Sequence, residues 1–340
     1  MWPRCKLQAP PACAGVREKV DGFVKRHVCV EGSQRRVVLV TSGGTTVPLE
    51  KNTVRFIDNF STGSRGSKSV ECFLEEQYAV IFLYRASSIQ PFAQLKDLLA
   101  RDILSSQNTQ KCHDGYTLRA RLSGSEAAAA DRLLSIYRQN VEQDDCLLCL
   151  PFTSVFEYLH SLKAACEALR PAGARAMVYL AAAVSDYFVP EAEMAEHKIQ
   201  SSSGDLVLSL RATPKCLSLL KGAWCPDALV VSFKLETDNK ILLSKATGAI
   251  EKYGVDCVIA NLLHTRNTEV QVVVRSHGGE RLGCGSLAGA EAELLQPGDF
   301  QRVRVTVDKA EEGGSHAQIE RPLVVTMTQM HRAFLNPTAD

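Results

Sequence analysis

The chain has 340 residues, of which 45% are hydrophobic and 23% are charged, as in an average globular protein and unlike a disordered chain. Lys and Arg number 39 against 38 Asp and Glu, so the net charge of +1 lacks the basic excess of a dedicated nucleic-acid-binding protein. The longest apolar run, about residues 176–184, is too short for a membrane span, and no apolar core of a signal peptide opens the chain, so we expect a cytoplasmic protein without a nucleic-acid or membrane partner.

In chain order, the first half of the sequence alternates between helical and strand patterns. Continuous apolar runs predict strands that are buried on both faces, and apolar residues at helical spacing predict the helices between them. The expected order is a helix at 15–27, a strand at 37–40, a helix after residue 66, a strand at 79–84, helices at 95–104 and 125–140, a strand at 146–150 and a helix from Ser154 to just before Pro171.

The second half continues this alternation and then changes to alternating apolar and polar residues. The expected elements are strands at 176–184 and 206–210, a short helix at 215–222, a strand at 229–233, a helix from Asp238 to Gly254, a strand at 255–260, alternating strands at 270–274 and 303–307 and a helix at 319–334. Strands separated by helices imply right-handed crossovers and a parallel sheet. We therefore expect an α/β fold with a mostly parallel sheet flanked by helices, and an antiparallel appendage near the C-terminal part.

The twelve cysteines are scattered, and most of them lie inside apolar runs. The one C-x-x-C pair, Cys146 and Cys149, stands among leucines and has no second pair of ligands at zinc spacing. This context is typical of buried free thiols, and abundant free cysteine indicates a reducing compartment. The sequence predicts no resident metal site.

Polar or glycine-rich segments follow four of the predicted strands. Because ligands of parallel sheets bind at the carboxyl ends of the strands, we expect these segments to converge on one site. Their candidate residues are Ser42, Gly43, Gly44 and Thr45 after the first strand, Ser185 and Asp186, then Phe233, Lys234 and Glu236, and finally Asn261.

A serine- and glycine-rich segment, residues 61–67, opens a predicted helix, where backbone N–H groups could bind a phosphate. A plain helix start explains the same residues, so both interpretations stay open at this point. The segment is not a P-loop, since Ser67 stands where a glycine must precede Lys68, and no G-x-G-x-x-G follows the first strand. Lys198, on a polar loop, would ordinarily be a solvated lysine.

Five motifs then carry a resemblance to a known family. They are VTSGGTTVPLEKNTVRFIDNFSTGSRG, YLAAAVSDYFVP, EHKIQSSSG, SFKLETD and VIANLL, in this order. Together they resemble the phosphopantothenate–cysteine ligases of the eukaryotic, single-function type, over about residues 36–265. The resemblance implies a Rossmann-like sheet, a homodimer, and the joining of 4′-phosphopantothenate to L-cysteine in coenzyme A biosynthesis. It also implies ATP as co-substrate, with Mg²⁺, and an acyl-nucleotidylate intermediate.

The resemblance also assigns roles to individual residues. The nucleotide and its phosphates are assigned to Gly43, Ser61, Gly63 and Gly66, and its base and ribose to Phe233 and Asn261. The phosphopantothenate is assigned to Asn59, Ala182, Ala183 and Asp186, with Arg55 reaching the substrate phosphate of the neighbouring subunit. Lys198 is expected to neutralise charge around the activated carboxylate, with Asn59 as the second catalytic residue. In this loop only Lys198 and the neutral Gln200 stand where bacterial relatives have several lysines, which favours ATP over CTP.

The expected organisation is an N-terminal helical arm, residues 1–34, and a single ligase domain, residues 35–335. A dimerisation and flap region is expected at about 186–212 and 268–315.

Two alternative functions fit the sequence less well than the ligase. A nicotinamide-dependent oxidoreductase lacks its glycine fingerprint and a hydride-transfer dyad. A non-catalytic regulatory homologue that binds phosphopantothenate or nucleotide is disfavoured because Asn59, Lys198 and Asp186 are all present.

Overall fold

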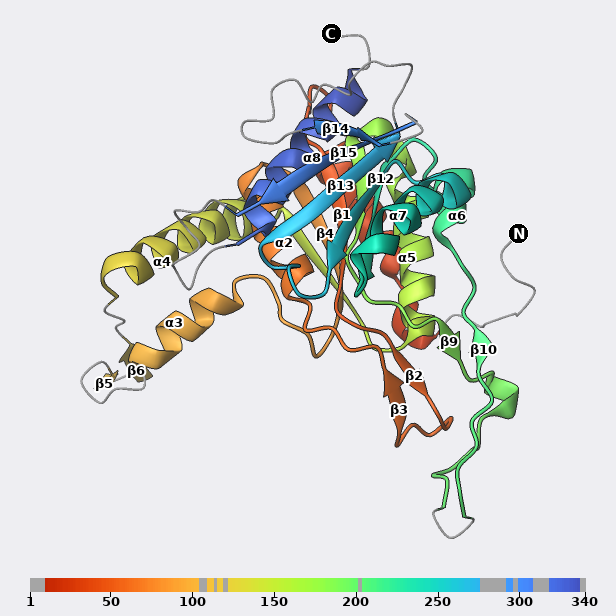
Figure 1. Ribbon diagram of the computed structural model, residues 1–340. Helices are drawn as coiled ribbons and strands as arrows, with labels where there is room; N and C mark the ends of the chain where they lie inside the picture. The colour runs from red at the N-terminus through yellow and green to blue at the C-terminus, as the bar shows by residue number, and fades with distance from the viewer. Residues whose placement is uncertain are drawn as a thin grey trace.

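Figure 1 shows the computed structural model of the chain, which describes residues 10–103, 109–112, 115–118, 122–200, 204–275, 292–295, 299–307 and 318–336. Its described residues form a nine-stranded sheet in the order β14-β15-β13-β12-β11-β8-β1-β4-β7, with helices on both faces. This arrangement confirms the predicted α/β class.

Six neighbouring strands of this sheet are parallel. They are β1 (Val37–Ser42), β4 (Ala79–Arg85), β7 (Leu147–Phe152), β8 (Ala176–Leu180), β11 (Leu229–Glu236) and β12 (Cys257–Leu262). Numbered along the chain, their spatial order is 3-2-1-4-5-6, which is the order of the Rossmann fold. The expected Rossmann-like sheet is therefore confirmed. Its topological switch point lies between β1 and β8.

Three antiparallel strands extend the sheet beyond β12. They are β13 (Glu269–Arg275), β15 (Phe300–Thr306) and β14 (Ala292–Leu295). The buried residues of β15 largely alternate with exposed ones, as expected for a strand with one solvated face. The predicted antiparallel appendage is confirmed.

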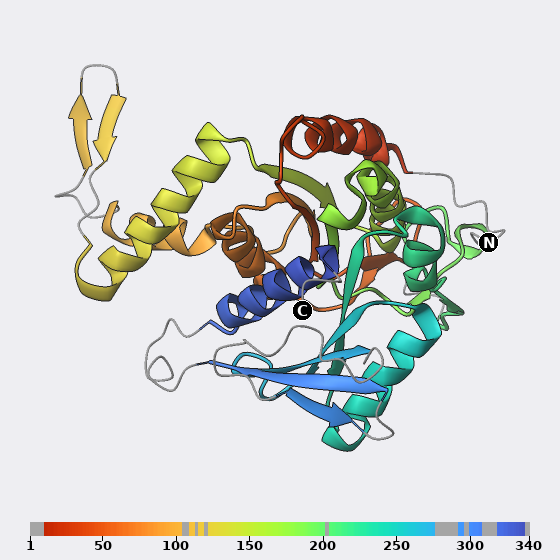
Figure 2. The same cartoon turned by 90° about the horizontal axis from the view of Figure 1, so that it is seen from above.

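Helices cover the sheet on both faces, because β1 presents Val37 and Leu39 to one side and Val38 and Val40 to the other. The first side packs against α1 (Val16–His27), α5 (Val155–Leu169) and α7 (Asn239–Tyr253). The second side packs against α2 (Ser64–Glu75), α3 (Ala93–Ile103), α4 (Gly124–Ile136) and α8 (Glu320–Leu335). Figure 2 shows these two layers from above. Helix α1 lies in the first layer, and the division of the chain at residue 34 stays a prediction.

The helix ends follow the predicted signals. Ser154 Oγ accepts a hydrogen bond from the N–H of Glu157 at 3.2 Å and starts α5. Asp238 caps α7 through the N–H of Lys240 at 2.9 Å, and Gly254, with φ of 69°, ends that helix.

The short elements are η1 (Pro11–Cys13), β2 (Thr46–Pro48), β3 (Phe56–Asp58), β5 (Thr109–Cys112), β6 (Gly115–Leu118), η2 (Tyr137–Gln143), η3 (Arg170–Arg175), β9 (Tyr187–Phe188), η4 (Glu191–Glu193), β10 (Arg211–Ala212), α6 (Leu217–Leu219) and η6 (Leu220–Trp224).

Two strand predictions are wrong in extent or place. The run 176–184 ends as a strand at Leu180, because the next residues leave the sheet to bond the loop after β1. The strand expected at 206–210 is absent, and the pairing in this part is Arg211–Ala212 with Tyr187–Phe188. Residues 206–210 expose their apolar side chains, so this hydrophobic pattern does not mark a buried strand of this chain.

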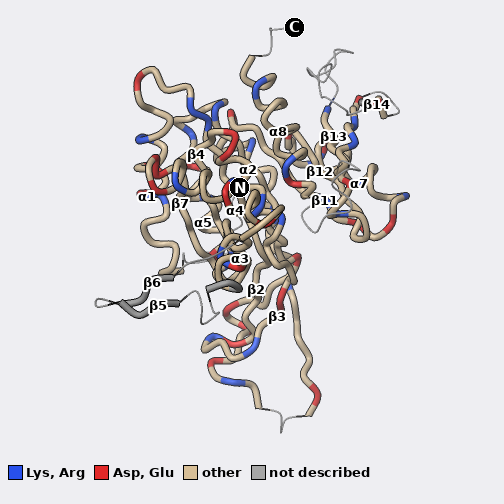
Figure 3. Tube along the Cα trace, turned by 90° about the vertical axis from the view of Figure 1, so that its left-hand side faces the viewer, with Lys and Arg blue, Asp and Glu red and all other residues tan. Residues whose placement is uncertain are grey.

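Two segments project together from the carboxyl edge of the sheet (Figure 1). One is residues 46–58, with β2 and β3, and the other is residues 187–200 and 204–212, with β9 and β10. We call them the arm. Helices α3 and α4, with β5 and β6, extend away in another direction (Figure 2). Basic and acidic residues are interspersed along the trace in Figure 3, consistent with the net charge of +1. Among the described helices, none has the length and apolarity to cross a bilayer.

Candidate active site

The candidate site lies at the switch point, where the loops after β1 and β8 bond to each other. The N–H of Ala183 donates to the carbonyl of Gly43 at 2.9 Å, and the N–H of Thr45 donates to the carbonyl of Ala183 at 3.0 Å. The N–H of Ala182 donates to Thr41 Oγ1 at 3.1 Å. These bonds fix the small residues Ala182 and Ala183 beside Gly43, as the sequence predicts for converging strand ends.

Two glycines, which have no side chain, let neighbouring segments of the chain pack closely against the end of β1. A Cβ on Gly44 would lie 1.6 Å from the carbonyl oxygen of Asn59, whose N–H donates to the carbonyl of Thr45 at 3.1 Å. A Cβ on Gly66 would lie 2.5 Å from both Cβ and Oγ of Ser42. Glycine at these positions therefore draws the Asn59 segment and the start of α2 against the end of β1.

The N-terminus of α2 opens onto this edge. Gly63 precedes the helix with φ of 80°, its N–H is bonded to Ser61 Oγ at 3.3 Å, and its carbonyl accepts from Ser42 Oγ at 2.9 Å. Gly63 has no side chain to cap the helix, the N–H of Ser64 donates to Thr62 Oγ1 at 3.4 Å, and the first turn holds no acidic residue. The first N–H groups of a helix lack partners within the helix and attract anions. Ser61, Gly63 and Gly66, which the family resemblance assigns to the phosphates, thus lie at this helix start.

Phe233 and Asn261 lie on the neighbouring strands β11 and β12. The ring of Phe233 contacts Tyr179 edge-on, with centroids 5.0 Å apart. Asn261 is 7% exposed, and its Oδ1 has no hydrogen-bond partner among the described residues. A buried amide oxygen without a partner is costly, so a donor from a ligand would satisfy it.

Arg55 and Lys198 lie in the arm, and a residue that the sequence did not single out connects their two segments. Glu50 is completely buried. Its Oε2 accepts from the N–H groups of Arg55 at 2.9 Å and Val54 at 3.2 Å, and its Oε1 accepts from Arg55 Nη1 at 2.9 Å and the N–H of Ile199 at 3.3 Å. The N–H of Arg55, followed by those of Val54 and Ile199 and by the Arg55 guanidinium, holds the pKa of Glu50 below its ordinary value of 4.5.

Further bonds run along the same two segments. The N–H of Lys51 donates to the carbonyl of Ala195 at 2.9 Å, and Lys51 Nζ pairs with Glu196 Oε2 at 2.9 Å. Arg55 Nη1 also donates to the carbonyl of Ile199 at 3.0 Å. The exposed Lys198 is therefore carried by a segment anchored to the Arg55 loop. A single glutamate next to Leu49 has no sequence pattern that could have revealed this role.

Arg85 is a second residue that the sequence analysis missed. It ends β4, is largely buried, and pairs through Nη1 with Asp58 Oδ1 at 2.5 Å. Its Cβ lies 2.7 Å from the position that a Cβ of Gly43 would take. The sequence could have pointed to Arg85, because it is a basic residue directly after the apolar run 79–84, at the sheet edge where ligands of parallel sheets bind.

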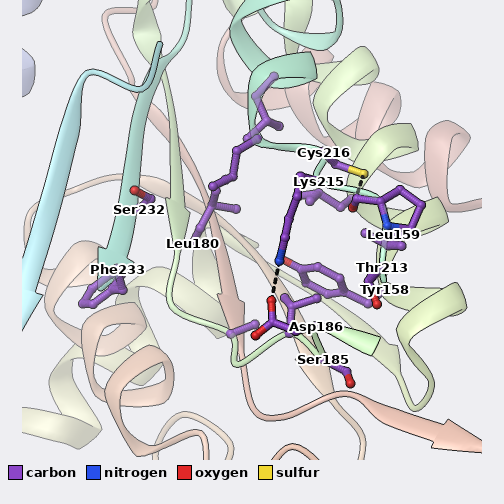
Figure 4. Close-up of a pocket in the computed structure, with 16 residues that line it drawn as sticks. Tyr158, Leu159, Leu180, Ser185, Asp186, Thr213, Lys215, Cys216, Ser232 and Phe233 are labelled. Atoms are coloured by element: carbon purple, nitrogen blue, oxygen red, sulfur yellow. Dashed lines mark hydrogen bonds and ion pairs between the residues drawn. The ribbon is translucent and has the colours of Figure 1, made fainter. Parts of the chain in front are cut away.

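A pocket of about 180 Å³ lies next to Ala182 (Figure 4). Leucines from β8, α5 and the segment 213–220 line it, and an ion pair between Asp186 and Lys215 stands at its side. Thr213, which is 5% exposed, lines the pocket, and its Oγ1 has no hydrogen-bond partner in the described part of the chain. The sequence pointed to Asp186 but not to Lys215 or Thr213, because nothing in it indicates that the segment 213–220 lines a pocket together with the loop after β8.

No group of three or more His, Cys, Asp or Glu side chains within the described ranges is arranged to hold a metal ion. Several cations near the carboxyl edge are paired with carboxylates, among them Arg85 with Asp58, Lys215 with Asp186 and Lys234 with Glu236.

Comparison with known proteins gives one consistent group of relatives. A family profile described as "DNA/pantothenate metabolism flavoprotein C-terminal domain" matches residues 157–278. The chain is 39% identical to human phosphopantothenate–cysteine ligase over 348 residues, covering 98% of each chain. It is 46% identical to Arabidopsis thaliana phosphopantothenate–cysteine ligase 1 over 253 residues, covering 73% of this chain and 75% of the relative. A solved Cab2 mutant in complex with phosphopantothenate-cysteine superposes with a TM-score of 0.73 at 34% identity, covering 97% of both chains.

Proposed function

This chain belongs to the phosphopantothenate–cysteine ligase family of carbon–nitrogen ligases, and from that membership we propose that it joins 4′-phosphopantothenate to L-cysteine in coenzyme A biosynthesis, with ATP as co-substrate. The observation that carries the proposal is the switch point itself. There Gly43, Asn59, Ala183 and the open start of α2 meet on one edge. This edge offers a phosphate site beside a small-residue segment that a chain-like substrate can approach.

In the first step, a carboxylate oxygen of phosphopantothenate attacks the α-phosphorus of ATP. A new P–O bond forms, the bond to the β-phosphate breaks, and pyrophosphate leaves with the bonding electrons. The carboxylate thereby gains a leaving group, which it lacks at neutral pH. The first-turn N–H groups of α2, after Gly63, would hold the phosphates, and Asn261 Oδ1 would accept a donor from the base or ribose.

In the second step, the neutral amine of cysteine attacks the acyl carbon. The C–N bond forms, the bond from that carbon to the nucleotide oxygen breaks, and the nucleotide monophosphate leaves. The nitrogen, an ammonium in free cysteine, gives up two protons in all as it becomes an amide. Lys198 would neutralise negative charge that develops at the activated carboxyl group, and Asn59 would position that group.

The arm supports a proposed homodimer. It exposes an unusual set of large apolar side chains, namely Val54, Phe56, Ile57, Tyr187, Leu206, Val207, Leu208 and Leu210, and Phe60, just beyond the arm, is exposed as well. Val207 is 89% exposed, and surfaces of this kind mark contacts with other proteins. We assign the arm to contact with a second copy, to which Arg55 would supply its guanidinium. Arg55 remains 37% exposed while it is paired with Glu50.

Mg²⁺, which the family resemblance implies, would enter on the nucleotide phosphates, because the described residues offer no set of ligands of their own. Its chemistry there would be to neutralise charge on the departing pyrophosphate. We place the enzyme in the cytoplasm, where buried free thiols such as Cys72 and Cys166 would stay reduced.

Pyrophosphate release tests the proposal directly. Purified protein would be mixed with 4′-phosphopantothenate, Mg²⁺ and either ATP or CTP, with and without cysteine. We expect sustained release with ATP and cysteine, and a single burst without cysteine as the acyl-nucleotidylate accumulates. Absence of release with either nucleotide, from folded protein that still binds phosphopantothenate, would identify a non-catalytic binding homologue and refute the ligase.

A further inference from the structure

We propose that Arg65 is a positioning residue for the nucleotide. Its guanidinium joins the start of α2, where the phosphates are proposed to bind, to the loop after β12, which follows Asn261. The inference rests on the proposed ligase function. It adds to that function the residue that sets the spacing between the phosphate end and the base end of the nucleotide site.

Arg65 lies in the first turn of α2, directly before Gly66, and its side chain contacts two other segments of the chain. Through Nη2 it donates to the carbonyl oxygen of Arg266, and through Nη1 it pairs with Glu320 Oε1 at 3.1 Å. Only 16% of the side chain is exposed. The planar guanidinium holds its donors in a fixed fork, so it can bind both partners at once in one geometry.

Glu320 fixes the place of this guanidinium. It lies in the first turn of α8, which packs beside α2 (Figure 2), and it is 6% exposed. A buried carboxylate without a cation is costly, so Glu320 and Arg65 hold each other in position. The loop after β12 is therefore anchored through Arg65 to both α2 and α8.

The anchored loop continues directly from the strand that carries Asn261. Within this loop the N–H groups of Thr268 and Glu269 both donate to the carbonyl of Thr265 at 2.9 Å, which makes the turn compact. A displacement of Arg266 would therefore be transmitted to the end of β12. There Asn261 Oδ1, which has no partner among the described residues, is proposed to accept a donor from the base or ribose.

A nucleoside triphosphate must contact both ends of this site at the same time. When the separation of two subsites is fixed, a ligand that has bound one end binds the other at little further cost in ordering, and this gain shrinks when the subsites move relative to each other. Arg65 is thus expected to raise the affinity for ATP without touching it. The competing interpretation is that Arg65 contacts the phosphates directly.

Calorimetric titrations with ATP, adenosine and inorganic tripolyphosphate separate these two interpretations. We expect Arg65→Met to weaken ATP binding about tenfold, while the affinities for adenosine and tripolyphosphate, each of which occupies one end only, change less than about twofold. An equal loss of affinity for tripolyphosphate would show a direct phosphate contact and overturn the positioning role, as would unchanged affinity for ATP. Wild-type protein that binds no ATP would instead refute the proposed function.

A second variant separates positioning from stability, because Arg65→Met leaves the buried Glu320 without a cation. In Arg65→Met/Glu320→Met both buried charges are removed together, so thermal stability should return to near the wild-type value. The affinity for ATP should stay low, since the carbonyl of Arg266 still lacks its donor. Recovery of ATP affinity together with stability would identify a merely structural role and overturn the proposal.

Arg132→Met is the matched control. Arg132 Nε donates to Glu75 Oε1 at 3.0 Å, and Glu75 ends the same helix α2, away from the phosphate site. This variant removes an ion pair of the same kind from α2 and should change the affinity for ATP by no more than about twofold. An equal loss of ATP affinity in both variants would refute a specific role of Arg65.

Discussion

At the carboxyl edge of the sheet, the loops pack too closely to admit a Cβ at Gly44 or Gly66, whereas in the arm one buried carboxylate accepts hydrogen bonds from two segments. The loops at the edge bond through main-chain groups and through the hydroxyls of Thr41 and Ser42. The arm depends on the carboxylate of Glu50, which accepts from three backbone N–H groups and one guanidinium. The difference indicates a rigid frame at the proposed nucleotide site and a separate support for Arg55 and Lys198.

The largest effect is expected from Gly44→Ala. Its Cβ would lie 1.6 Å from the carbonyl oxygen of Asn59, so the loops must move apart. Overpacking of this kind costs about 3 kcal/mol or more, and we expect activity to be lost with it. Thermal unfolding and pyrophosphate release would measure both.

Gly248→Ala is the matched control for Gly44→Ala. It lies within α7 and meets nothing within 4 Å of the added Cβ. Alanine in a helix is more stable than glycine by up to about 1 kcal/mol, so this variant should keep its activity and gain stability. Equal tolerance of both substitutions would show that the edge is not rigid.

Lys198→Ala tests the arm in the reaction. We expect pyrophosphate release to slow about 100-fold while nucleotide affinity stays nearly constant, because the proposed role of Lys198 is confined to charge that develops during the reaction. Single-turnover kinetics and nucleotide titration would separate the two. A variant with wild-type turnover would remove Lys198 from the mechanism.

Glu50→Ala should have a smaller effect of a different kind. It leaves three N–H groups without an acceptor and releases Arg55, so we expect KM for phosphopantothenate to rise about tenfold, with less change in kcat. Thermal stability of the sheet should change little. Glu196→Ala, which breaks the exposed pair with Lys51, should change KM by no more than about twofold. Equal effects of the two variants on KM would contradict the role of Glu50 in holding the two arm segments together.

As the pH falls, the arm should lose its hydrogen-exchange protection before the carboxyl edge of the sheet does. Because the pKa of Glu50 is lowered in the folded protein, its contribution is present above 4.5 and is lost as the pH falls through the lower folded-state value. Amide hydrogen exchange is the measurement. We expect Val54, Arg55 and Ile199 to lose protection below pH 4.5, while the N–H groups of Thr45 and Ala183 stay protected. Loss of amide protection at the same pH in the arm and at the carboxyl edge would contradict a separate role of Glu50 in the arm.

Local sequence patterns predicted most of the fold because they depend on burial and on caps. The run Val37–Val40 specified a strand covered on both faces, and Ser154 and Asp238 marked helix starts through their own hydrogen bonds. The same patterns failed at 206–210, where apolar residues lie on an exposed arm. Burial, not hydrophobicity alone, decides whether such a run becomes a strand.

The sequence by itself determined the family, the parallel sheet and the set of residues at the strand ends, because motifs and apolar periods are properties of neighbours along the chain. Only the tertiary structure decided that Glu50 joins Arg55 to Ile199, that Arg85 borders Gly43, and that Lys215 meets Asp186 beside a pocket. Those contacts form between segments far apart in the sequence, and a buried carboxylate or an exposed lysine acquires its role only from the groups that folding brings to it.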